Sequence, residues 1–241
     1  RVAQFRSGQL LYVVVSFPGI IDDNKVVLSN AIPLFNGADI GELFNTIAKD
    51  KIDVVNNMTV KVIGMHEKFS YKNYSNIVYL SHEQDGVGSG LIINDQVYEG
   101  AGKGAGEVGL MFNVTNPLPV KNLKNNIVKF GSLLFQTKIS DCRSLDEWCE
   151  SVLHDTEKLE QISQYYSIVL NNFGHILDPD IIILGGLLTK LGSPFFKKVT
   201  YYTRQISKTP IKVVLSDFDE QAINLGLAVI GDKHISRLII T

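Results

Sequence analysis

The feature that most restricts how this chain can fold is a glycine-rich stretch at residues 85–111, DGVGSGLIINDQVYEGAGKGAGEVGLM. Eight of the chain's 20 glycines lie between Gly86 and Gly109. Glycine is used where φ must be positive or where another group approaches the main chain closely. The pattern predicts an apolar strand that opens with three glycines, a tight turn at Asn94-Asp95, and a second glycine-rich loop around one carboxylate, Glu107.

Two interpretations of this stretch are open. Backbone N–H groups of a glycine-rich turn can hold phosphate, and a carboxylate in such a loop can accept hydrogen bonds from hydroxyl groups. The alternative is a β-hairpin with a loose loop and no ligand, which a single GxGxG pattern favours. The choice depends on the other motifs of the chain.

Strands alternate with helices along the sequence, which predicts an α/β fold with largely parallel strand pairing. We expect strands at 10–17, 25–28, 53–56, 77–80, 91–93, 180–184 and 211–215. We expect helices at 39–49, 59–69, 127–136, 144–153, 156–174, 194–206 and 220–230, and a helix start after Gly185-Gly186.

Composition excludes several classes of protein. The 241 residues are 45% hydrophobic, which is enough for one large domain or two lobes. The net charge is −2 and no basic stripe occurs, so the chain is not built to hold a nucleic-acid backbone. No apolar run reaches transmembrane length and the start lacks a signal-peptide cleavage pattern, so we expect a cytoplasmic protein with no membrane partner.

Cysteine and histidine usage indicates no metal site. Cys142 and Cys149 are seven residues apart in an expected helix, too far along its axis for a disulfide, and are expected to be free thiols. The five histidines are scattered without ligand spacing. We therefore expect no metal.

Five blocks of sequence stand in a recognisable order. They are SFPGIID at 16–22, SNAIPLFNG at 29–37, VVNNMTVKVIGMHE at 54–67, the segment 76–111 that includes the glycine-rich stretch, and LDPDIIILGGLL at 177–188. Together they resemble the ROK family of bacterial sugar kinases, sugar-responsive transcriptional repressors and their relatives, over about residues 13–228.

The resemblance implies a two-lobed α/β fold of the actin and hexokinase type, with sugar and nucleotide bound in the cleft between the lobes. It implies an N-terminal lobe at 1–80, whose first strands are missing from this chain. It implies a C-terminal lobe at 81–241, whose final helix, at about 220–232, packs back on the first lobe.

The departures from the family pattern concern catalysis. Family kinases carry Asn-Asp where this chain has Asn56-Asn57, and that Asp takes the proton from the sugar hydroxyl. A carboxamide has no proton-accepting pKa in the useful range, and loss of a general base costs about 10²- to 10⁴-fold in rate. The family's zinc-binding His is replaced by Leu110, and no cysteine occurs between Met111 and Asp141. The resemblance therefore implies neither kinase activity nor zinc.

The nucleotide side of the family site is also altered. The family's Gly-Thr-Gly-Val-Gly block reads QDGVG at 84–88, where the Asp85 carboxylate would repel phosphate. The resemblance makes five glycines remnants of the nucleotide loops: Gly86, Gly88, Gly90, Gly185 and Gly186. We expect no bound cofactor.

The sugar side is better preserved. By resemblance, Asn30, Asn56, Asn57 and Glu107 contact sugar hydroxyls, and Gly19 lines the same cleft. Amides and a carboxylate suit a polyol, because each hydroxyl both donates and accepts hydrogen bonds. The alternative is that Asn30 and Asn56 are simply turn and strand-end residues.

The resulting hypothesis is a non-catalytic sugar-sensing and oligomerisation domain of a ROK-type transcriptional regulator. It implies a monosaccharide effector, a homodimer or higher homo-oligomer, and contact with DNA only through an N-terminal helix-turn-helix that this sequence lacks. The alternative is a ROK sugar kinase that phosphorylates a hexose or an N-acetylhexosamine with a divergent active site. A third possibility is a structural or partner-binding relic that binds no small molecule.

Overall fold

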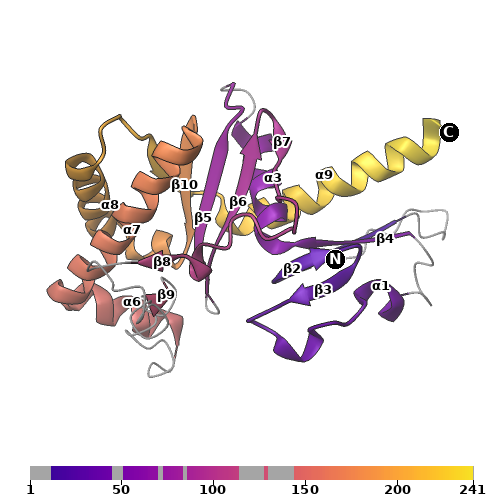
Figure 1. The fold of residues 1–241 in the computed structure, drawn as a ribbon, viewed down its shortest axis with the longest axis horizontal. Helices are drawn as coiled ribbons and strands as arrows, with labels where there is room; N and C mark the ends of the chain where they lie inside the picture. The colour runs from indigo at the N-terminus through magenta and orange to yellow at the C-terminus, as the bar shows by residue number, and fades with distance from the viewer. Residues whose placement is uncertain are drawn as a thin grey trace, which may run out of the picture. The chain divides into compact units, whose positions relative to one another are not determined.

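The computed structural model describes residues 12–44, 51–69, 73–83, 86–113, 128–129 and 144–240, and the chain divides into two compact units (Figure 1). Unit 1 comprises residues 1–79, 90–105 and 218–241, and unit 2 comprises residues 80–89 and 106–217. Residues 90–105 fall in unit 1 and residues 80–89 in unit 2. The lobes that the sequence suggested, 1–80 and 81–241, stay a prediction.

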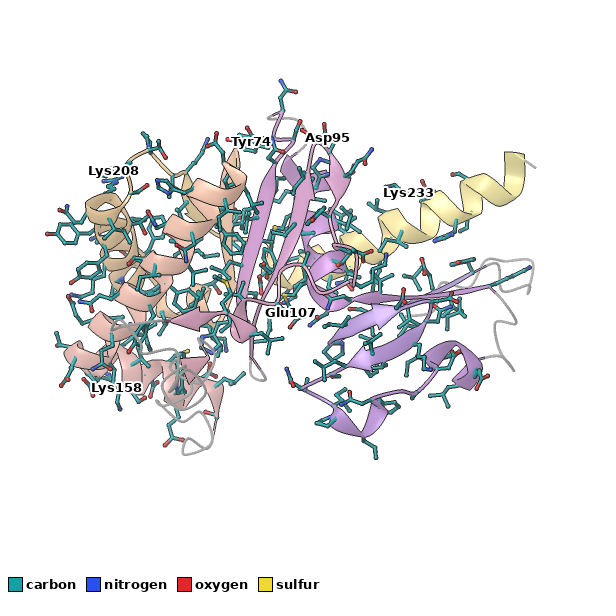
Figure 2. The ribbon with its side chains drawn as sticks, in the orientation of Figure 1. Tyr74, Asp95, Glu107, Lys158, Lys208 and Lys233 are labelled. Atoms are coloured by element: carbon teal, nitrogen blue, oxygen red, sulfur yellow. The ribbon has the colours of Figure 1, made fainter. Side chains whose placement is uncertain are left out.

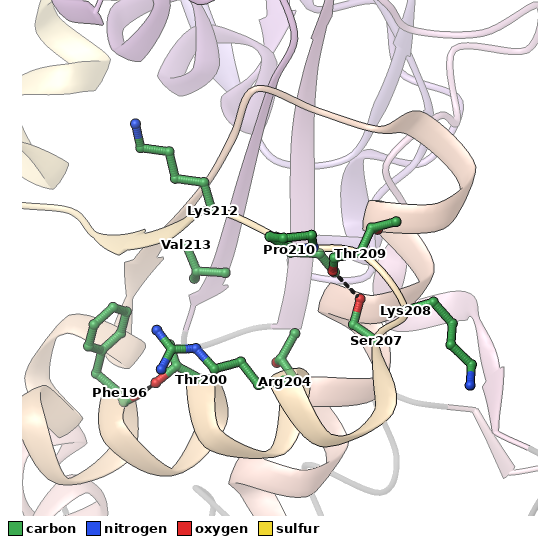
Figure 3. Close-up of a pocket in the computed structure, with 11 residues that line it drawn as sticks. Phe196, Thr200, Arg204, Ser207, Lys208, Thr209, Pro210, Lys212 and Val213 are labelled. Carbon is green, nitrogen blue, oxygen red and sulfur yellow. Dashed lines mark hydrogen bonds between the residues drawn. The ribbon is translucent and has the colours of Figure 1, made fainter.

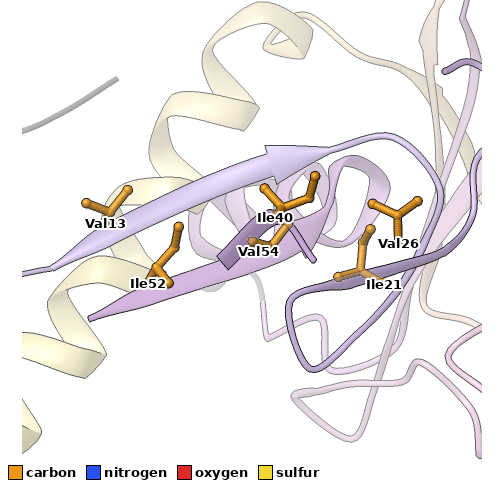
Figure 4. Packing of buried hydrophobic residues seen from close by; sticks show 6 residues of the cluster. All are labelled: Val13, Ile21, Val26, Ile40, Ile52 and Val54. Carbon is orange, nitrogen blue, oxygen red and sulfur yellow. The ribbon is translucent and has the colours of Figure 1, made fainter. Parts of the chain in front are cut away.

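The core of unit 1 is built from two strand pairs. β1 (Val13–Phe17) and β4 (Ile52–Asn56) pair in parallel, while β2 (Ile20–Asp22) and β3 (Lys25–Leu28) form an antiparallel hairpin. The 3₁₀ helix η1 (Pro33–Phe35) and α1 (Ile40–Leu43) follow β3. The buried side chains of this core, shown in Figure 4, are Val13, Ile21, Val26, Ile40, Ile52 and Val54.

Two long helices of unit 1, α3 (Asn57–Phe69) and α9 (Asp219–Ile240), pack with their backbones in direct contact. A Cβ on Gly64 would lie 2.0 Å from the Ala222 carbonyl oxygen, and one on Gly226 would lie 1.9 Å from the Val60 carbonyl oxygen. Only glycine permits this separation. The sequence places the end of α9 at Ile230, which is wrong, because the helix continues for ten further residues.

Five strands form the larger sheet, in the order β11-β10-β5-β6-β7. Their bounds are Val213–Leu215, Ile181–Gly186, Ile77–Glu83, Gly86–Ile93 and Gln96–Val97, respectively. β10 and β11 are parallel, and β6 and β7 are antiparallel. The turn at Asn94 and Asp95 is confirmed: both residues have positive φ, 53° and 62°, as a two-residue type I′ turn requires.

The helices of unit 2 surround an aromatic core. They are α6 (Leu145–His154), α7 (Thr156–Leu177) and α8 (Leu187–Ile206), and α8 is interrupted at Gly192, where φ is 59°. α6 begins as the sequence predicts, with the Ser144 hydroxyl oxygen accepting a 3.1 Å hydrogen bond from the Glu147 backbone nitrogen. His82 of β5 lies fully buried in this core, 5.3 Å from the Trp148 ring centre.

One predicted helix is wrong at its start. Val128–Lys129, in the expected helix at 127–136, forms strand β9, which pairs with β8 (Phe112–Asn113). The remainder of that expected helix, the end of the expected helix at 39–49, and Cys142 lie outside the described residues. Within the described part of the chain, none of the helices has the length and apolar character needed to cross a bilayer.

Candidate functional site

Asn56, at the end of β4, joins three parts of unit 1. Its side-chain nitrogen donates a 2.6 Å hydrogen bond to the Gly19 carbonyl oxygen. Its side-chain oxygen accepts hydrogen bonds from the backbone nitrogens of Met58, at 2.7 Å, and Thr59, at 3.1 Å. Asn56 therefore caps the start of α3 and anchors the Pro18-Gly19 turn, which gives it a structural role whether or not it contacts a ligand.

Asn57, at the position that resembles the family's catalytic Asp, is the first residue of α3 and is half-buried. Its side-chain oxygen lies 3.0 Å from the Met58 backbone nitrogen, and its side-chain nitrogen donates to none of the described residues. The positive end of a helix dipole would favour a carboxylate here. The neutral carboxamide can orient a hydroxyl group but cannot remove its proton.

The segment that carries Asn30 lies against the Gly19 turn. Gly19 has φ of 124°, and a Cβ on it would lie 2.4 Å from the Leu28 carbonyl oxygen, so only glycine fits. Ser29 is buried, and its hydroxyl oxygen accepts a 3.0 Å hydrogen bond from the Ile32 backbone nitrogen. Asn30 itself is exposed. Unit 1 thus places Asn56 and the Ser29-Asn30 segment against the same glycine.

Glu107 belongs to unit 2, where it precedes the 3₁₀ helix η3 (Val108–Leu110); Figure 2 labels it. The preceding residue, Gly106, is held on β6 by a 2.8 Å hydrogen bond from the Ser89 backbone nitrogen to its carbonyl oxygen. The Glu107 carboxylate makes no hydrogen bond with any described residue, and its burial raises its pKa above the ordinary value. It is thus a half-buried polar group suited to a ligand hydroxyl.

The glycines predicted as nucleotide-loop remnants also have packing roles. Gly86, Gly88 and Gly90 lie in β6, and a Cβ on Gly90 would be 2.3 Å from the Met58 carbonyl oxygen. Gly185 is buried at the end of β10, and a Cβ on Gly186 would be 2.2 Å from the His82 carbonyl oxygen. Packing alone therefore requires two of these glycines, and a role in binding nucleotide stays a prediction. Asp85 lies outside the described residues.

Asn56 also borders a pocket of about 490 Å³ in unit 1 that the sequence did not reveal. Its polar lining consists of Asp22, Asp23, Asn24, Asp53, Asn56, Thr59, Glu99 and Lys103. Two of the carboxylates are paired: His234 Nε2 lies 2.9 Å from Asp53 Oδ2, and the Lys103 ammonium lies 2.7 Å from Glu99 Oε2. Asp53 and His234 lie far apart in the sequence, and Glu99 and Lys103 lie in a loop, so residue spacing predicted neither pair. Asn30, Asn57 and Glu107 do not line this pocket.

Metal ligands are not gathered anywhere in the described part of the chain. No group of three or more His, Cys, Asp or Glu side chains among those residues is placed to hold a metal ion. Cys149 is a buried free thiol whose pKa is raised by its burial.

Comparison with known proteins agrees with the family resemblance and with the fold type that it implies. Residues 2–121 match the model of the ROK family. The chain is 25% identical over 241 residues to the xylose repressor of Staphylococcus xylosus; this alignment covers 90% of the chain but only 59% of the repressor. The chain therefore spans about three fifths of the length of that curated relative.

Two solved structures define the fold. The ROK hexokinase of Thermus thermophilus superposes with a TM-score of 0.73 at 16% identity, over 96% of this chain and 82% of the hexokinase. A ROK family transcriptional regulator, a homologue of the E. coli MLC protein, superposes with a TM-score of 0.68 at 18% identity, over 94% of this chain and 63% of the regulator. The fold is accordingly the α/β fold of the actin and hexokinase type, and the chain belongs to the ROK family.

Proposed function

We propose that this chain is the non-catalytic, sugar-sensing part of a ROK-type transcriptional regulator. The observation that carries the proposal is the Asn57 carboxamide at the start of α3, where the family resemblance expects the catalytic carboxylate. Phosphoryl transfer to a sugar requires a group that accepts the hydroxyl proton, and an amide does not supply it. The repressor and the transcriptional regulator among the similar proteins support the same assignment.

The ligand we propose is a neutral monosaccharide, with xylose as the first to test because of the similarity to a xylose repressor. Asn30, Asn57 and Glu107 are the proposed contacts, and Asn56 contributes chiefly by holding the Gly19 turn and the start of α3. Amide and carboxyl groups match the paired donor and acceptor character of sugar hydroxyls. The Glu107 carboxyl is suited to this role because no described residue uses its oxygens.

Calorimetric titration with xylose, glucose and N-acetylmannosamine tests the proposal. We expect saturable binding of at least one sugar, and a loss of about tenfold or more in affinity when Glu107 is replaced by Gln, since a charge-assisted hydrogen bond is lost. The matched replacement in the unit 1 pocket, Glu99→Gln, should leave affinity unchanged. If the affinity depends on Glu99 instead of Glu107, the sugar binds in the unit 1 pocket. If no sugar gives a binding heat, the proposed sensor function is wrong.

A sugar kinase is the second candidate, because structural neighbours such as the Thermus thermophilus hexokinase are kinases. It requires a base other than Asn57. A coupled assay of ATP consumption with each sugar separates the two candidates, since only the kinase turns over. DNA binding and homodimerisation remain predictions from the family resemblance, and a cytoplasmic location remains a prediction from the sequence composition. We place the DNA-binding element outside residues 1–241, because the xylose repressor extends beyond the aligned part.

A further inference from the structure

Glu107 is the central residue of a tight turn in unit 2. Its φ and ψ angles are −71° and 65°, and the Val108 backbone nitrogen donates a 2.7 Å hydrogen bond to the Gly106 carbonyl oxygen. A hydrogen bond of this span around a residue with these angles defines an inverse γ-turn. The proposed sugar-binding carboxylate is therefore carried by one defined backbone conformation.

Ser89 of β6 adds two hydrogen bonds to this turn. Its backbone nitrogen donates to the Gly106 carbonyl oxygen at 2.8 Å, and its hydroxyl donates to the same oxygen at 3.0 Å. Ser89 is only 5% exposed, so its hydroxyl is withdrawn from water and needs a partner within the protein. Most of the hydrogen bonding to the Gly106 carbonyl oxygen thus comes from Ser89.

These bonds reach Glu107 through the geometry of the peptide group. The Gly106 carbonyl group and the nitrogen and Cα of Glu107 lie in one plane, so fixing that carbonyl fixes the direction in which the chain enters Glu107. On the other side, the Glu107 carbonyl oxygen accepts a 3.0 Å hydrogen bond from the Leu110 backbone nitrogen. Both peptide planes that flank the Glu107 Cα are therefore held by hydrogen bonds.

Two glycines let this turn lie close to β6. A Cβ on Gly106, whose φ is 93°, would lie 2.2 Å from the Ser89 carbonyl oxygen, and one on Gly109 would lie 3.0 Å from the Val87 carbonyl oxygen. Gly102, which is exposed in the loop before the turn, differs because a Cβ there would meet nothing within 4 Å. The close approach to β6 thus belongs to the turn that carries Glu107 and is not shared by every glycine of the loop.

We propose that Ser89 is a positioning residue of the sugar site, and that it acts by holding Gly106 and thereby the backbone of Glu107. This inference rests on the sugar-binding function proposed above, in which Glu107 contacts a hydroxyl group. A binding group must be held within about 0.5 Å of its productive position, and strands hold side chains more precisely than loops do. Ser89 attaches a carboxylate that follows a loop to a strand of the sheet.

Two variants test the effect on binding. Gly106→Ala should displace the turn, whereas Ser89→Ala removes the hydroxyl donor and keeps the backbone donor. We use calorimetric titration with xylose or, if xylose does not bind, with glucose or N-acetylmannosamine. We expect Gly106→Ala to weaken binding by about tenfold or more. Ser89→Ala should weaken it by about fivefold, as the loss of one neutral hydrogen bond predicts.

Each variant has a matched control. For Gly106→Ala it is Gly102→Ala, where a methyl group finds open space. For Ser89→Ala it is Ser207→Ala, because the half-buried Ser207 also donates from its hydroxyl to a backbone carbonyl oxygen, that of Thr209 at 2.7 Å (Figure 3). Ser207 lies at the end of α8, where it and Arg204 line a cavity of about 640 Å³. Both controls should change the affinity by less than about twofold.

The Glu107 carboxyl group gives a second measurement that needs no sugar. Burial raises its pKa in the wild type, and carbon NMR follows its ionisation, with Glu107→Gln identifying the signal by its loss. When the turn is released, the carboxyl group reaches water, so its pKa should fall towards the ordinary value in Gly106→Ala and Ser89→Ala. A general loss of stability would not change this pKa in the folded protein, and circular dichroism checks the folding of each variant.

The outcomes are distinct. A lowered pKa of Glu107 in both variants, with weaker sugar binding and unchanged controls, supports the proposal. An unchanged pKa, an affinity that Ser89→Ala leaves within twofold of the wild type, or equal effects of Gly102→Ala and Ser207→Ala overturns it. If Gly106→Ala does not fold, Ser89→Ala alone decides. If the wild type binds no sugar, the proposed function fails, while the NMR titration still decides whether Ser89 positions Glu107.

Discussion

The side-chain nitrogen of Asn56 donates a 2.6 Å hydrogen bond to the carbonyl oxygen of Gly19, a residue 37 positions earlier in the chain. This bond ties the end of β4 to the Pro18-Gly19 turn, while the oxygen of the same amide caps α3. Two of the proposed sugar contacts, Asn30 and Asn57, thus lie beside elements that the Asn56 side chain holds: the Gly19 turn, against which Ser29 packs, and the start of α3.

Replacing Asn56 should therefore destabilise the protein. For Asn56→Ala we expect the free energy of unfolding to fall by about 1–2 kcal/mol, the usual cost of a lost helix cap. Asn56→Asp keeps the oxygen that caps α3 but places a second acceptor oxygen against the Gly19 carbonyl oxygen, so it should also destabilise the protein. Urea denaturation measures both. The exposed Asn30→Ala is the control and should change stability by less than about 0.5 kcal/mol; an equal loss in this control would argue against a special role for Asn56.

The contact between α3 and α9 gives a second prediction. Gly226→Ala would place a methyl group 1.9 Å from the Val60 carbonyl oxygen, so the helices must separate. We expect a loss of about 1–3 kcal/mol in the free energy of unfolding. Gly231→Ala, on the same helix, meets only Val14 Cγ2 at 3.9 Å. This control should be neutral or stabilising by up to about 1 kcal/mol, since alanine favours helix over glycine. Equal effects at the two positions would contradict the packing described for α9.

Glu107 provides a test that links stability to binding. Burial raises the pKa of its carboxyl group, so the folded protein holds the proton more tightly than the unfolded chain does. Above the folded-state pKa, ionisation of Glu107 therefore lowers the free energy of unfolding. This loss of stability disappears as the pH falls below the pKa that the carboxyl group has in the unfolded chain. We expect Glu107→Gln to be more stable than the wild type at pH 7 and to lose this advantage at acid pH, while binding sugar more weakly. Denaturation at several pH values measures the stability, and parallel titrations with sugar measure the affinity. A Glu107→Gln protein that is less stable than the wild type at pH 7 would contradict this expectation.

His82 should give the opposite dependence. Burial lowers the pKa of His82 to about 4, although the nearby charge of Glu83 acts to raise it. Between the unfolded value of 6.5 and about 4, the unfolded chain binds the proton and the folded one does not, so stability falls as pH falls through this range. The loss should reach about 3 kcal/mol by pH 4. His82→Gln, which cannot titrate, should flatten this part of the stability curve; an unchanged slope would show that other groups cause it.

Much of the fold followed from local sequence signals. The Asn94-Asp95 turn was predictable because both residue types tolerate positive φ. The buried strands β5 and β10 were predictable from continuous apolar runs. The end of α9 was not, because a glycine follows Ile230 and glycine is common just after a helix, yet α9 continues through Gly231 to Ile240.

The candidate site was predictable only in part. The family resemblance directed attention to Asn56 and Asn57, but the sequence could not show that Asn56 uses both ends of its amide on the protein's own backbone. The Asp53–His234 pair and the cavity beside Arg204 depend on contacts made only in the folded chain. No spacing rule reaches across 181 residues.

One calorimetric experiment tests the central claim most directly: titration of xylose into the protein in the presence of Mg²⁺ and ATP. Binding without catalysis gives saturable heats that return to the baseline after each injection. A kinase gives heat that continues after each injection until ATP is consumed. We predict saturable heats with an unchanged baseline, because Asn57 cannot accept the hydroxyl proton. Sustained heat that depends on both xylose and ATP would contradict the account.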